Sequence, residues 1–322
     1  VKDLQGAELS GLEVGGVASV TGQASLTNAA SSSNVEGGTS TATADIAIST
    51  DHGTGIQGLT ADATRFAAST DSGVYSTAGV DVSSDGTLTG LASISNSASA
   101  ESTASSADAK ATASTVDGAQ LDTVEIGGVG SITGQTNFAG SADATSVTGP
   151  TSTADASLAD ADGLQGLAKI DVSSDAGLTG INSVDLTATS ASTGGASPSA
   201  ASSIAEATTL QGAQLGNNTD IGGVGNIGGQ VDFNATAAST NVTGSATAGA
   251  SLGEVKDGFA VPTSASYSPT TGVDLGALTD GTGLAQGLVT RTDNSPTAYG
   301  TDIKSDGTLQ GFANLSNTAD AS

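Results

Sequence analysis

The chain has 322 residues, and its 33 Asp and Glu outnumber its seven Lys and Arg, so the formal net charge is -26. This charge argues against nucleic acid and anionic membrane surfaces as partners, because both need a basic protein surface. The absence of Cys excludes a disulfide scaffold and a Cys-ligated metal site. No apolar run approaches the ~20 residues of a membrane-spanning helix, so we expect no membrane insertion.

Small residues dominate the chain, and aromatic residues make up only 2% of it. Leu, Ile, Val and Phe are too few for a thick core. We therefore expect a thin core of small side chains, organised mainly by backbone hydrogen bonds.

A seven-residue pattern recurs along the chain: an aliphatic residue, any residue, Gly, an apolar residue, two mostly small residues and an aliphatic residue. Its copies begin at Val14, Leu88, Ile126, Leu164, Leu178, Ile221 and Leu309. The copies belong to two kinds of half-module that alternate from one end of the chain to the other. Self-similarity of this kind is typical of repeat architectures, and it divides the chain into three modules, 1–112, 113–206 and 207–322.

The segments between these copies predict strands. "TATADIAIS" (41–49) and "STADASLADAD" (152–162) alternate small apolar with polar residues, which is the period of a half-buried strand. Helical periodicity is rare, and the best helix candidate is "ASSIAEATTLQGAQL" (201–215).

Short strands, frequent turns and internal repeats predict an all-β fold, a β-solenoid of three continuous modules. Three tandem β-sandwich domains are the alternative. In a solenoid, the glycines of the repeat would form corners, for example at Gly15–Gly16, where a Cβ is disfavoured.

Two motifs suggest ligands or chemistry, and each has a simpler structural interpretation. "GVGNIG" (223–228) matches a dinucleotide-binding loop, but the residues after it read as a strand where that loop needs a helix. "GASLG" (249–253) matches a nucleophile elbow, but the only His is His52, in a predicted turn. A glycosidase would need carboxylates in a groove lined by Phe66, Tyr75 or Tyr267. We therefore expect no enzyme, no catalytic residues and no cofactor.

Calcium is the one cofactor that remains open. Three pairs of carboxylates in predicted Gly/Ser turns could supply oxygen ligands: Asp81 with Asp85, Asp171 with Asp175, and Asp160 with Asp162. Turn-forming and solubilising roles explain the same residues without a metal.

The regular Gly/Ser/Thr/Ala/Asp repeats, with no Cys and few Lys or Arg, resemble segments of large bacterial adhesins and extracellular filament proteins. "GLTGINSVDLTATSAST" (177–193) is similar to repeats of marine cyanobacterial proteins. The resemblance implies an extracellular or cell-surface location and structural or adhesive work.

Both ends of the chain carry repeat sequence without a polar cap, and such ends expose strand edges. We therefore expect subunits to stack head to tail into an open homopolymeric filament, through Leu4, Leu309, Phe312 and Leu315. The alternative is a spacer or adhesin segment of a larger surface protein or phage fibre, stiffened by calcium and carrying a surface or glycan ligand.

Overall fold

The computed structural model describes most of the chain in segments. These are residues 4–9, 13–14, 19–35, 37–46, 56–61, 80–82, 86–121, 124–126, 130–166, 170–172, 176–193, 200–215, 219–221, 226–242, 244–252, 266–268, 272–274, 285–290, 302–303 and 308–322.

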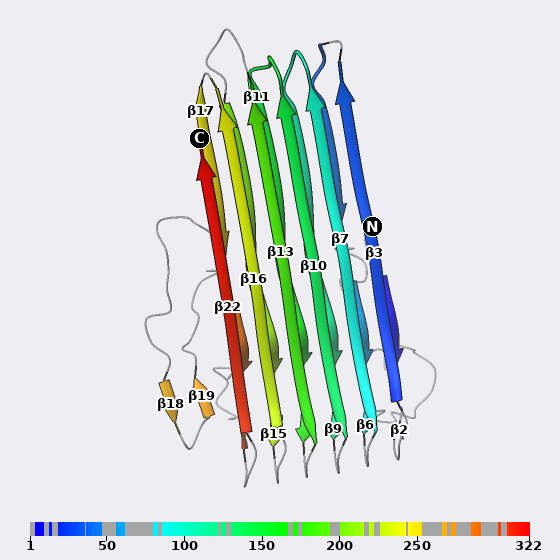
Figure 1. The fold of residues 1–322 in the computed structure, drawn as a ribbon. Coiled ribbons are helices and arrows are strands. Elements are labelled where there is room, and N and C mark those ends of the chain that lie inside the picture. The colour runs from blue at the N-terminus through cyan, green and yellow to red at the C-terminus, as the bar shows by residue number, and fades with distance from the viewer. Residues whose placement is uncertain are drawn as a thin grey trace, which may run out of the picture.

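The described chain winds through three parallel sheets (Figure 1). The front sheet contains six long strands: β3 (Ser19–Asn34), β7 (Thr87–Ser102), β10 (Ser131–Ser146), β13 (Gly177–Ser192), β16 (Asn226–Asn241) and β22 (Thr308–Ala321). The back sheet contains eight strands: β1 (Leu4–Leu9), β4 (Ser40–Ile46), β5 (Ile56–Ala61), β8 (Ala107–Leu121), β11 (Thr151–Gly166), β14 (Ala200–Leu215), β17 (Ser245–Leu252) and β20 (Ala285–Thr290).

A third, short-strand sheet lies at one edge of these two (Figure 1). It contains β2 (Glu13–Val14), β6 (Val80–Val82), β9 (Val124–Ile126), β12 (Ile170–Val172), β15 (Thr219–Ile221) and β21 (Asp302–Ile303). In chain order, one coil consists of a front strand, a back strand and a short strand, as in β10–β11–β12. A separate antiparallel pair is formed by β18 (Ser266–Ser268) and β19 (Gly272–Asp274).

The fold is the predicted all-β solenoid. All pairings in the three main sheets are parallel, whereas the tandem sandwiches considered as the alternative would be antiparallel. The helix candidate 201–215 is wrong, because these residues form β14, which pairs with β11 on one side and with β17 and β20 on the other. Its inward Ala side chains fit between two sheets, and this packing overrides the high helix propensity of Ala.

Alternation of small side chains builds the core. In β10 every second residue is buried, and the inward positions of neighbouring strands stack in columns across the sheets. One front-sheet column contains Leu26, Ile94, Phe138, Val184, Phe233 and Leu315. The back sheet contributes mainly Ala to the same core, together with larger residues such as Ile46, Leu158 and Leu210.

Glycines bring the front and back sheets into direct contact along one line, which we call the glycine waist. A Cβ on Gly134 would lie under 3.0 Å from the carbonyl oxygen of Gly163, and one on Gly180 would meet that of Gly212 in the same way. A Cβ on Gly118 would likewise meet backbone atoms of Gln135. Packed sheets normally lie ~10 Å apart, so only glycine allows this approach. Leu88, Ile132, Leu178 and Ile227 are buried outside the main core cluster.

The coils show which repeat copies are structurally equivalent. Leu88 stacks on Val20 and Ile132, and not on Val14 or Ile126, which pair within the short-strand sheet. The seven-residue copies therefore occupy different places in the coil. Each predicted module spans about two coils, and its boundaries at 112/113 and 206/207 lie within β8 and β14. The predicted corner at Gly15–Gly16 lies outside the described residues.

Candidate functional site: the two ends of the coil stack

The C-terminal end of the stack exposes a strand that its own chain does not cover. β22 pairs with β16 on one edge, and no described strand pairs with its other edge. Leu315 belongs to the core column of Phe138 and Phe233, which are 2% and 3% exposed, yet Leu315 is 55% exposed. This difference arises because β22 is the last described front strand and, although β17 and β20 contact it, the described residues include no back strand after it.

The N-terminal end exposes the complementary part of a coil. β1 lies beyond β5 in the back sheet and β2 lies beyond β6 in the short-strand sheet, whereas the front sheet ends at β3. Among the described strands, none pairs with the outer edges of β1, β2 and β3. Unpaired edges of this kind are templates for further strands.

The four predicted interface residues lie at these two ends. Leu4 is the first residue of β1, and Leu309, Phe312 and Leu315 lie on β22. Leu315 occupies the core column, whereas Phe312 stacks on Gln230 and is 59% exposed on the outward face. The side chains of Leu4 and Leu309 lie outside the described part.

Acidic residues form a continuous column in the short-strand sheet, which we call the acidic column. The register stacks Glu13 on Asp81, Asp81 on Glu125, Glu125 on Asp171, Asp171 on Asp220 and Asp220 on Asp302. Neighbouring strands lie ~4.8 Å apart, and like charges directly opposite each other destabilise a sheet. Because the five intervals between these residues have no common length, sequence reasoning missed this column.

The Glu125→Gln variant is expected to raise the free energy of unfolding by about 0.5–1 kcal/mol, because it removes one member of the acidic column. Added salt is expected to stabilise the parent protein and to reduce the gain from the substitution, since salt screens charges. Urea unfolding at low and high NaCl concentration measures both effects. Asp108→Asn is the control, because the ladder neighbours of Asp108 are Thr41 and Thr153. An equal gain in the free energy of unfolding in both variants would show that the acidic column is not the cause of the gain.

The calcium candidates lie in strands where they fall within the described residues, and the prediction that they occupy turns is wrong there. Asp81 and Asp171 belong to the acidic column. Asp160 and Asp162 lie in β11, and Asp162 is 1% exposed, stacked on Asp117 and Gln211. No group of three or more His, Asp or Glu that could hold a metal ion occurs in the part that the structure describes. Asp85 and Asp175 lie outside it.

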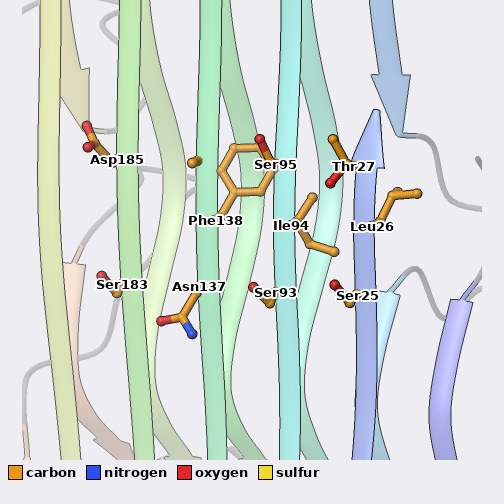
Figure 2. Close-up of a pocket in the computed structure, with 11 residues that line it drawn as sticks. Ser25, Leu26, Thr27, Ser93, Ile94, Ser95, Asn137, Phe138, Ser183 and Asp185 are labelled. Atoms are coloured by element: carbon orange, nitrogen blue, oxygen red, sulfur yellow. The ribbon is translucent and has the colours of Figure 1, made fainter. Parts of the chain in front are cut away.

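The outward face of the front sheet carries short polar side chains around a shallow pocket (Figure 2). Ser25, Ser93, Asn137 and Ser183 form one row, and Thr27, Ser95, Ala139 and Asp185 form the next. Between the rows, Leu26, Ile94 and Phe138 belong to the inward column. The amide of Asn234 donates a 3.1 Å hydrogen bond to Asp185. This pocket offers hydroxyl and amide groups and the carboxylate of Asp185.

The remaining motifs give no site within the described residues. Ser251 of "GASLG" lies in β17, next to its last residue, and Gly253 lies outside the described part. His52, Phe66, Tyr75 and residues 223–225 of "GVGNIG" lie outside the described part. Tyr267 lies in β18, and its side chain is outside the described part too.

Buried amides and hydroxyls are a further set of residues that sequence reasoning missed. Asn96 donates to the carbonyl oxygens of Ala44 (3.1 Å) and Thr112 (2.9 Å), and its own Oδ1 accepts from Asn28 (3.1 Å). Thr136 and Asn182 donate in the same way to back-sheet carbonyls of Asp162 and Gln211. Polar residues at inward positions therefore link the front sheet to the back sheet, as buried polar groups require.

The described residues contain no helix long and apolar enough to cross a membrane. Comparison of the chain with protein-family models, curated proteins and solved structures finds no match to any of them.

Proposed function

We propose that the protein is a structural subunit of an extracellular or cell-surface filament, in which solenoids stack head to tail. The observation that carries this proposal is the uncovered end strand β22. Among the described strands, none pairs with its outer edge, and it places Leu315, a core-column residue, 55% exposed. A free edge and an apolar side chain favour addition of another strand.

Three further features support a homopolymer and an extracellular location. A contact between unlike ends does not close on itself, so repeated stacking produces an open filament. The net charge of -26 keeps neighbouring filaments apart in solution. The absence of Cys and the repeat composition are those of secreted bacterial surface proteins, which the chain resembles.

Negative-stain electron microscopy of the purified protein, with calcium and with chelator, tests the proposal. Uniform fibres whose length grows with protein concentration are the expected result in both conditions. Fibres with calcium alone would assign calcium a role in assembly. Single short rods at all concentrations would overturn the filament and favour a spacer or adhesin segment of a larger surface protein.

A further inference from the structure

We propose that two copies join by sharing one coil, to which each contributes strands that the described part of the other does not supply. β22 of one copy supplies the front strand of this coil, and β1 and β2 of the second copy supply its back and short strands. This inference rests on the head-to-tail assembly proposed above, and it adds the strands and the register of the joint.

The two ends of the described chain are steps of complementary shape. At the C-terminal end the front sheet extends one strand further than the back and short-strand sheets, because β22 follows β16 while β17, β20 and β21 end their sheets. At the N-terminal end the back and short-strand sheets extend one strand beyond β3. Figure 1 shows β22 and β3 at opposite ends of the front sheet. Stacking the two ends continues the front sheet, the short-strand sheet and the half of the back sheet that contains β1 and β20.

The register inside the chain fixes the register of the joint. Ser19 stacks on Thr87 at the first strand of the front sheet, and Asn226 stacks on Thr308 at its last. The same alignment places Asn314 of one copy beside Ser25 of the second, and Leu315 beside Leu26. In the back sheet, Leu4 of the second copy stands beside Ala285, since both occupy the position of Leu210.

The glycine waist indicates that the partner beside β22 is a second copy of this chain. Within a coil, a front-strand glycine meets a back-strand glycine, as Gly134 meets Gly163 and Gly180 meets Gly212. Gly311 of β22 and Gly6 of β1 occupy the same two columns, and both are exposed. The shared coil brings these two glycines together, so each end already carries the residue that close approach of the sheets requires.

An asparagine ladder gives independent support. Asn28 donates a 3.1 Å hydrogen bond to Asn96 in the next strand. Asn317 of β22 occupies the same inward column, whereas the four strands between have Asn96, Gly140, Leu186 and Ala235 there. In the joint, Asn317 lies directly beside Asn28 of the second copy and extends the ladder by one residue.

The joint leaves one place open. No described segment supplies the half of the back strand that would face Leu315, so this side chain gains Leu26 of the second copy as a neighbour and no opposing strand. The acidic column continues through Asp302 and Glu13 of the second copy, so we expect assembly to strengthen as salt screens these charges.

Disulfide trapping tests the register, and the chain contains no Cys of its own. The double variant Ser25→Cys with Asn314→Cys is expected to form a ladder of covalent multimers on oxidation under assembly conditions. The two positions lie five strand spacings apart in one chain, about 24 Å, so a disulfide within one chain is excluded. In the control, Ser31→Cys with Asn314→Cys, the register separates the two Cys in the joint by six residues, about 20 Å, and multimers are not expected.

The outcomes separate this inference from the filament proposal. Fibres with multimers from the Ser25 pair and none from the Ser31 pair support the shared coil. Fibres with multimers from neither pair, or from the Ser31 pair alone, would overturn the shared coil and leave the filament standing. The absence of fibres in the parent protein would overturn both.

A glycine variant tests the waist at the joint. Gly311→Leu is expected to raise the critical concentration for assembly at least about tenfold, while the urea midpoint of the monomer stays unchanged because Gly311 is exposed. Gly228→Leu is the control, because a Cβ at Gly228 would meet no atom within 4 Å. Parent-like assembly of the Gly311 variant would contradict the shared coil.

Discussion

Replacing Gly180 by Ala is expected to lower the free energy of unfolding by about 3 kcal/mol or more. The new Cβ would meet the carbonyl oxygen and carbonyl carbon of Gly212, which are backbone atoms of the opposing sheet. A side chain can relieve such a clash by changing its rotamer, but here the two sheets must separate. Separation would also disturb the neighbouring coils, because β13 and β14 are each paired on both sides.

Urea unfolding of purified Gly180→Ala, monitored by circular dichroism, measures this loss. Gly228→Ala is the matched control, since it adds the same methyl group to a front strand where no atom lies within 4 Å. Similar midpoints for the two variants and the parent would show that the sheets do not touch at the waist. Gly134→Ala repeats the test one coil away, against Gly163.

The Phe138→Ala variant is expected to lose about 3–5 kcal/mol of unfolding free energy, the usual cost of removing a buried aromatic ring. Phe138 is 2% exposed and belongs to the main core cluster. Its ring also fills the space left by Gly140, because a Cβ there would lie 2.9 Å from Phe138 Cε1. The flanking strands β7 and β13 are paired with β10 along its whole length, so the cavity cannot close by a local movement of the backbone.

The same substitution at Phe312 provides the control. Phe312 also lies on a front strand but is 59% exposed on the outward face, so Phe312→Ala should change the stability of the monomer by less than about 0.5 kcal/mol. Urea unfolding at a protein concentration below that of assembly compares the two variants. Equal losses would contradict the assignment of Phe138 to the core and Phe312 to the surface.

The candidate site combines predicted and unpredicted parts. Reading the bare repeat ends as strand edges identified β1 and β22, and with them Leu4, Leu309, Phe312 and Leu315. Leu315 lies in the core column and Phe312 on the outward face because of the strand register. A shift of one residue would exchange the two faces. The seven-residue repeat suggested a different alignment of the repeat copies, because similar residues occur at different places in one coil.

The sequence by itself determined the fold class. The chain alternates small apolar with polar residues, contains frequent Gly and repeats itself, and a stack of β-coils is the fold that buries enough surface with such a sequence. These signals are local, so they can be recognised without coordinates. The tertiary structure alone decided which residues share a column. The acidic column, the paired glycines of the waist and the asparagine ladder each join residues tens of positions apart, through intervals of unequal length. Their proximity follows from the closure of each coil, which depends on the turns and on sheet packing, and the unequal lengths of the coils hide it from the spacing of the residues.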